Sequence, residues 1–223
     1  MQVLGLIISV FPLLVGCYFI SKEIKEVIFL KKTLNQIIDK PRIESIEDFV
    51  QIKNYLQKNI SYNPELKHKK RPILRHTASE ILISKYGFCG ENARVAIKLM
   101  LLGGIKANRI YLFRKEWEHV LIEHKFNSNW FMFDGHLDTY TNLKDSDVLK
   151  IPSNQISLYP DSYPNNPYLG FSRIKLFYKL YSLKSFSKIR LHSYIIYLFE
   201  SPFLIKAILL SIPSLLFLII ILL

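Results

Sequence analysis

The chain has 223 residues, of which 50% are hydrophobic, a formal net charge of +12 and two cysteines. This length fits one domain with a proper core, but the hydrophobic content is above that of an ordinary soluble domain and indicates apolar segments outside the core. Cys17 lies in an apolar terminal segment and Cys89 far from it, so no intrachain disulfide is expected.

Residues 1–21 are apolar almost throughout. At ~1.5 Å per residue they are long enough to cross a ~30 Å hydrocarbon core, and they predict a transmembrane helix or signal anchor. The alternative is a cleaved signal, with lipidation of Cys17 after the run Leu14-Val15-Gly16 as one form of it. Two features argue against cleavage: no positive charge precedes the segment, and apolar residues follow Cys17.

Residues 22–75 predict a helical lead-in. An amphipathic pattern covers 22–40, and a second helix begins after Ser45, an N-cap residue with Asp48 three positions on. The basic loop at 67–72 lacks the interleaved aromatic residues that stack on bases. We therefore expect no nucleic-acid partner.

Cys89 opens the central part of the chain. A capping box from Thr77 to Glu80 predicts a short helix before it, and apolar residues at helical spacing predict a longer helix that begins at Cys89 and ends at Gly103. Unpaired N–H groups and the helix dipole favour a thiolate at such an N-terminus. Cys89 is thus a candidate nucleophile, although a lone cysteine can also be a small buried hydrophobe.

Two strands are predicted at 117–124 and 130–134, joined by the turn residues Asn127 and Ser128. With those two residues as the loop, Asp134 lies diagonal to His119 on the same face of the hairpin. A slip of two residues would place Asp134 directly opposite His119. Either register lets the carboxylate reach the imidazole.

The order of a cysteine, a histidine and an acidic residue suits acyl transfer to a thiol. Around these residues the sequence resembles the transglutaminase-like superfamily of papain-type cysteine enzymes over residues 76–140. The resemblance rests on the runs 77–82, 87–93, 102–107 and 119–123, with Trp130 and Asp134. It implies an α+β, papain-like core, in which the helix that bears Cys89 packs on an antiparallel sheet, flanked here by N- and C-terminal transmembrane helices.

The resemblance also implies roles: Cys89 as nucleophile, His119 as general base and acid, and Asp134 as the residue that orients the imidazole. Relatives usually have proline after the acidic residue, whereas Gly135 follows here, so His136 or Asp138 could take the place of Asp134. The backbone N–H of Cys89 is the one oxyanion donor we can name.

No cofactor is expected. A metal site that combines His119 and His124 with His136 and Asp138 is disfavoured, because the first two residues point to opposite faces of their strand.

The C-terminal part divides into three segments. Residues 141–172 are rich in Asn, Ser, Asp and Pro and predict a loop-rich extension without strands. Residues 173–200 predict a basic amphipathic segment on the membrane surface. Residues 202–223 are apolar apart from Lys206 and predict a second transmembrane helix.

Together these features predict a membrane-anchored thiol enzyme, a peptidase or amidase in preference to a transamidase. The alternative is a catalytically silent binding or scaffold module at the membrane. The expected partners are a peptide or protein amide substrate and anionic lipid headgroups. Lysines beside both apolar segments place the domain on the cytoplasmic side of a bacterial-type inner membrane.

Overall fold

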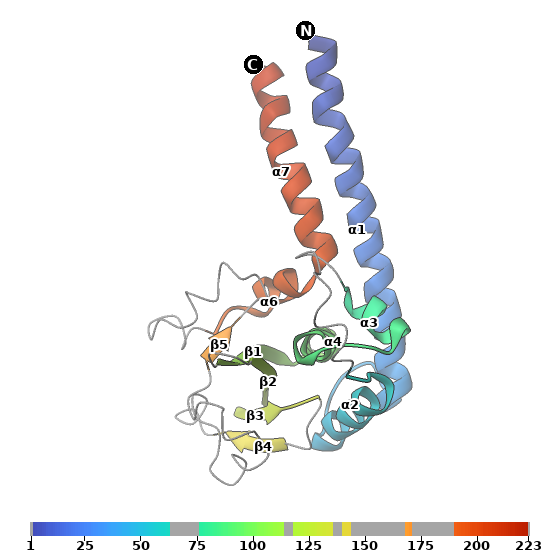
Figure 1. The fold of residues 1–223 in the computed structure, drawn as a ribbon, viewed down its shortest axis with the longest axis vertical. Helices are drawn as coiled ribbons and strands as arrows, with labels where there is room; N and C mark the ends of the chain where they lie inside the picture. The colour runs from blue at the N-terminus through green and yellow to red at the C-terminus, as the bar shows by residue number, and fades with distance from the viewer. Residues whose placement is uncertain are drawn as a thin grey trace.

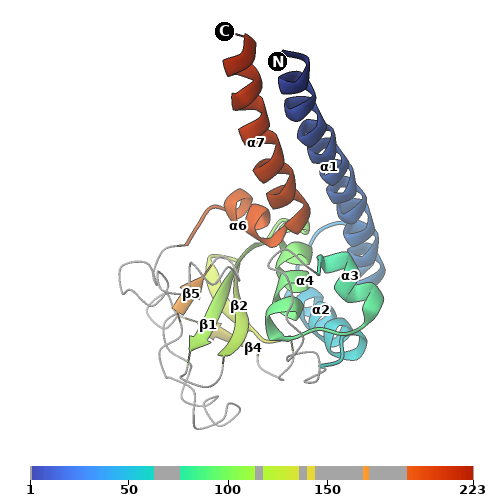
Figure 2. The same cartoon turned by 45° about the horizontal axis from the view of Figure 1, so that its top comes forward.

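The computed structural model describes residues 2–62, 76–113, 118–135, 140–143, 168–170 and 190–222. Two long helices, α1 and α7, stand side by side and project from a domain built of shorter helices and one sheet (Figures 1 and 2). Both chain termini lie at the far end of this helical pair (Figure 1). The basic loop at 67–72 and most of the basic segment at 173–200 lie outside the described residues.

Helix α1 runs without a break over Gln2–Ile38. The sequence predicted a boundary near residue 21, but no glycine or proline interrupts the chain there, and the apolar and amphipathic stretches join into one helix. The second half of α1 enters the domain core through Leu30, Leu34 and Ile38, which are at most 6% exposed. The same helix therefore belongs to the projecting pair and to the domain.

Helix α7, Pro202–Leu222, lies beside the first half of α1 (Figure 1). Its stretch Pro202–Ile220 is the one candidate among the described residues that is long and apolar enough to cross a membrane, judged by length and composition. The first transmembrane helix, expected at 1–21, remains a prediction. The two helices approach closely where a Cβ on Gly16 would lie 2.2 Å from the hydroxyl of Ser211.

The domain has three shorter helices before the sheet: α2 (Ile46–Asn59), α3 (Ala78–Ser84) and α4 (Cys89–Leu102), of which α4 packs against the sheet (Figure 1). The predicted caps are confirmed, since the side chains of Ser45 and Thr77 accept from the backbone N–H groups of Asp48 and Glu80. Helix α4 also ends where the sequence predicted, at Gly103.

The sheet is antiparallel with the order β4-β3-β2-β1-β5. Its strands are β1 (Lys106–Phe113), β2 (Glu118–Phe126), β3 (Asn129–Phe133), β4 (Tyr140–Leu143) and β5 (Tyr168–Gly170). The expectation of a strandless extension at 141–172 is wrong at β4 and β5. These short edge strands pair with β3 and β1, so their neighbours in the sheet override a loop-like composition.

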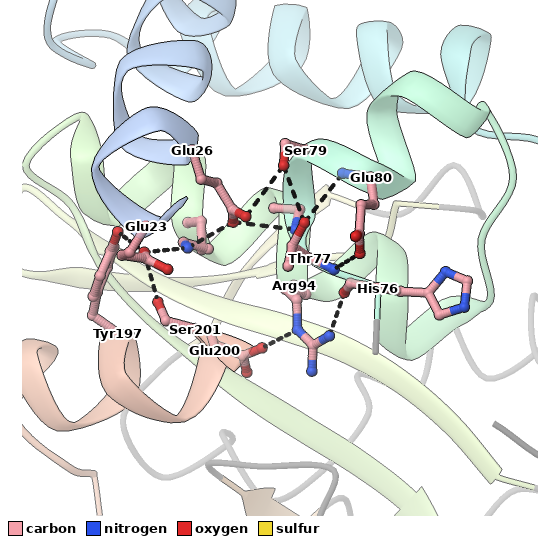
Figure 3. A network of polar contacts seen from close by, with 12 residues as sticks. Glu23, Glu26, His76, Thr77, Ser79, Glu80, Arg94, Tyr197, Glu200 and Ser201 are labelled. Atoms are coloured by element: carbon pink, nitrogen blue, oxygen red, sulfur yellow. Dashed lines mark hydrogen bonds and ion pairs between the residues drawn. The ribbon is translucent and has the colours of Figure 1, made fainter. Parts of the chain in front are cut away.

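A network of buried charges joins α1 to α4. The ammonium of Lys98 on α4 lies 2.7 Å from the carboxylates of both Glu23 and Glu26 on α1, and its side chain is fully buried. Glu26 also accepts from the backbone N–H of Ala78 and the hydroxyl of Ser79, each at 3.2 Å. Figure 3 shows how both carboxylates of α1 turn inward to this network.

Helix α6, Ser193–Glu200, extends the network. The hydroxyl of Tyr197 donates to Glu23 at 2.6 Å. Glu200 accepts from Arg94 on α4 at 3.3 Å and from Arg109 on β1 at 2.7 Å. Burial alone would raise the pKa of the Glu200 carboxyl, but the two guanidinium groups hold it below its ordinary value. The network thus ties α1, α4, β1 and α6 together.

Arg190 differs from the sequence expectation. It was expected on the lipid-facing basic segment, but its guanidinium binds the buried carboxylate of Glu123 at 2.9 Å and lies over the ring of Trp130 at 4.1 Å from the centroid. Asn108 also donates to Glu123, at 3.0 Å. Arg190 therefore fastens the chain to the sheet just before α6.

Candidate active site

Cys89 is the first residue of α4 and is half-buried. The residue before it, Phe88, has an extended backbone and forms the N-cap. Glu91, one turn into the helix, accepts from the backbone N–H of Phe88 at 2.9 Å. This bond fixes the start of the helix, so the thiol is held at the positive end of the helix dipole.

His119 and Asp134 come from neighbouring strands. His119 is the second residue of β2, and Asp134 directly follows β3. The hairpin pairs Ile122 with Phe133, which confirms the predicted register and leaves Asp134 diagonal to His119. His119 Nε2 lies 2.6 Å from Asp134 Oδ2, with 6% of the histidine and none of the aspartate exposed.

The side chains of Cys89 and His119 are also hydrogen-bonded. Because Nε2 is engaged by Asp134, Nδ1 is the ring nitrogen left to face the sulfur. Burial alone would lower the pKa of His119, but the charge and hydrogen bond of Asp134, together with those of Cys89, raise it to about 10. The imidazole is therefore held in its protonated form beside the thiol.

In this arrangement His119 can take a proton from the Cys89 thiol and later donate it to a leaving group. An imidazolium beside a thiolate forms an ion pair that keeps the sulfur nucleophilic, and the same imidazolium can protonate a leaving group. Asp134 fixes which ring nitrogen faces the sulfur. The structure thus brings together the three side chains that the sequence named.

Tyr62 is a neighbour of Cys89 that sequence reasoning missed. Backbone hydrogen bonds from Ser61 to Lys85 at 2.8 Å and from Gly87 to Ser61 at 3.1 Å place this segment beside the entry to α4. Its ring packs edge-on against Phe88, with centroids 5.8 Å apart. Burial and the charge of Cys89 raise the pKa of its phenol. No local pattern points to this position, because the contact depends on a pairing across 25 residues.

His124, another histidine named in the sequence, does not join the site. His124 is buried against the rings of Phe49 and Phe131, and burial lowers its pKa to about 3. His136 and Asp138, the alternative partners of His119, lie outside the described residues. Within the described part of the chain, no group of three His, Cys, Asp or Glu side chains could hold a metal ion.

Comparison with known proteins places part of the chain in a family. Residues 31–135 match the transglutaminase-like superfamily, which confirms the resemblance and extends it into α1. The crystal structure of a "putative cysteine protease" from Cytophaga hutchinsonii is 19% identical, with a TM-score of 0.41, over 49% of this chain and 37% of that one. The match thus spans little more than a third of that protein, and so weak a likeness has no weight for function. A search of curated proteins found no match.

Proposed function

Because residues 31–135 carry a transglutaminase-like core, we propose that this chain is a membrane-anchored thiol enzyme that cleaves amide or peptide bonds. The observation that carries the proposal is the hydrogen-bonded series from Cys89 through His119 to Asp134 at the N-terminus of α4. It supplies a nucleophile, an acid–base group and an orienting carboxylate, which are the parts that acyl transfer to a thiol requires.

In the first step the Cys89 thiolate attacks the carbonyl carbon of the substrate. The C–N bond then breaks as His119 gives its proton to the leaving amine, and a thioester remains on Cys89. The backbone N–H of Cys89, at the first position of α4, is the donor that we assign to the oxyanion. Asp134 holds the imidazole in place throughout.

In the second step the neutral His119 takes a proton from water. The resulting hydroxide attacks the thioester, the acid product leaves, and Cys89 returns to the thiolate beside the imidazolium. Hydrolysis is the reaction that we assign. Transfer of the same acyl group to an amine is the competing outcome, and a product formed only when an amine is supplied would replace hydrolysis by transamidation.

The anchor that we propose is α7 paired with the apolar first half of α1. Its support is the close approach at Gly16 and Ser211, since small residues allow membrane helices to pack tightly. Large apolar side chains on both helices are exposed, which suits contact with lipid. These include Phe11, Leu14, Tyr18, Leu209, Leu216 and Ile220.

Cytoplasmic placement of the domain is the orientation that we propose, because lysines such as Lys22 and Lys25 follow the apolar part of α1. The test is a membrane-impermeant maleimide applied to intact cells that carry a Cys17→Ser chain. Labelling of Cys89 only after permeabilisation is expected. Labelling without it would overturn the cytoplasmic placement.

The test of the activity itself is labelling of the full chain in membranes with an iodoacetamide probe, followed by a peptide-library cleavage screen. Cys89→Ala should abolish both signals, whereas the matched control Cys17→Ala should retain them. Amidase activity that persists in Cys89→Ala would refute the assignment of Cys89 as the nucleophile. A Cys89 thiol that titrates near ~8.5, together with no cleavage, would favour the silent binding module.

A further inference from the structure

Asn92 lies one turn beyond Cys89 on α4 and is 1% exposed. Its side-chain amide donates to the backbone carbonyl of Gly135 at 3.3 Å. Gly135 directly follows Asp134, the residue that holds the imidazole of His119. Asn92, on the same helix as Cys89, therefore hydrogen-bonds to the backbone directly after Asp134.

The contact also uses the absence of a side chain at Gly135. A Cβ at this position would lie 1.9 Å from the Asn92 side-chain oxygen and 2.6 Å from its Cγ. Any other residue, including the proline that usually follows the acid in the proteins this sequence resembles, would force the carboxamide out of this position. The present placement of Asn92 therefore depends on glycine at residue 135.

Only one half of the Asn92 carboxamide is hydrogen-bonded among the described residues. The amide nitrogen donates to Gly135, whereas the Oδ1 atom is buried without a partner there. A buried acceptor left unpaired is costly, so the side chain adds less to stability than a fully paired carboxamide would. A role in holding the backbone at Gly135 explains the carboxamide better than a contribution to stability does.

We propose that Asn92 is a positioning residue that fixes Asp134 relative to Cys89. The proposal rests on the proposed roles of Cys89, His119 and Asp134. Helix α4 then serves as a common support, which carries the nucleophile at its first residue and the anchor for the acid three residues later. Since a displacement of ~1 Å can cost ~100-fold in rate, such an anchor matters although it touches no reacting atom.

The experiment uses the full chain in detergent micelles with ring-labelled histidine. His119→Gln identifies the His119 resonance among the six histidines. In Asn92→Ala, the pKa of His119 should fall by about one unit, which corresponds to a tenfold weaker hold on the proton. Alkylation of Cys89 by iodoacetamide at neutral pH should slow by about tenfold, as expected when the ion pair is misaligned.

Asn108→Ala is the matched control. Asn108 is also a buried asparagine, 5% exposed, and its amide donates at 3.0 Å to Glu123, which is not one of the three residues of the proposed mechanism. Its loss should lower the melting temperature but leave the titration of His119 and the alkylation of Cys89 unchanged. If Asn92→Ala does not fold, Asn92→Ser should give the same shifts, because its hydroxyl is too short to reach Gly135.

The results separate the two proposals. A wild-type His119 that titrates near ~6.5 would refute the ion pair, and with it both the proposed function and the role of Asn92. A raised pKa in the wild type that is unchanged in Asn92→Ala would overturn the role of Asn92 alone. Equal shifts in the Asn92 and Asn108 variants would overturn it as well, since the effect would then be a general loss of stability.

Discussion

Replacement of Lys98 by methionine tests how the long helices are joined to the domain. Methionine keeps an unbranched apolar stem but removes the ammonium that lies 2.7 Å from both Glu23 and Glu26. Two carboxylates that are 4% and 2% exposed would then lack their cation. Removal of one partner from a buried ion pair typically costs ~3–5 kcal/mol.

The expected change in melting temperature follows from this cost. In a chain of this size, 1 kcal/mol shifts the melting temperature by ~2–4 °C, so Lys98→Met should melt at least ~6 °C below wild type. The double variant Lys98→Met/Glu26→Gln should recover part of the loss, because it removes one of the two uncompensated charges. Circular dichroism of the full chain in detergent micelles, heated at pH 7, measures both changes.

Lys58→Met is the matched control, since Lys58 is exposed in the last turn of α2. Substitutions at such surface positions usually change stability by no more than ~0.5 kcal/mol, which is ~2 °C here. A Lys98→Met chain that melts within that margin of wild type would refute the reasoning. The buried charges would then not hold α1 to α4.

Three further predictions concern the site, the anchor and a helix cap. The pKa of His119 is raised to about 10, so protonation of this residue stabilises the folded chain fully below the unfolded pKa of ~6.5, and this stability is lost as the pH rises toward 10. The melting temperature of the wild type should therefore fall between pH 7 and 10. Asp134→Asn should make that fall smaller. Gly16→Leu should separate α1 from α7, because a Cβ there would meet Ser211 at 2.2 Å, and cysteine crosslinking between the two helices would report the loss. Thr77→Ala removes the cap of α3 and should cost ~1 kcal/mol in thermal unfolding, and no change would mean that the cap is not formed in solution.

The features that the sequence predicted are those with a local cause. The start of α4 at Cys89, the caps at Ser45 and Thr77, and the hairpin register each depend on residues within a few positions of one another. The spacing of apolar residues and the residue types at turns and caps are sufficient to predict such features. The placement of His119 next to Asp134 follows from the register, which is why both candidate residues could be named in advance.

The features that the sequence did not predict depend on distant partners. Strand β5 forms because β1 offers an edge, although its own composition resembles a loop. Asn92 looks like an ordinary polar residue of α4 until the chain at Gly135 is placed against it, 43 residues away. Lys98 likewise gives no sign in the sequence that its partners lie on α1.

The buried charge network sets limits on where this protein can be cut. The family match begins at residue 31, inside α1, and ends at residue 135. A fragment trimmed to those limits would keep Lys98 and Arg109 but lose Glu23, Glu26 and Glu200, so buried cations would remain without their carboxylates. A shortened chain that keeps this network therefore has to start before Glu23 and continue past Glu200, with both cuts placed at the foot of the projecting helices.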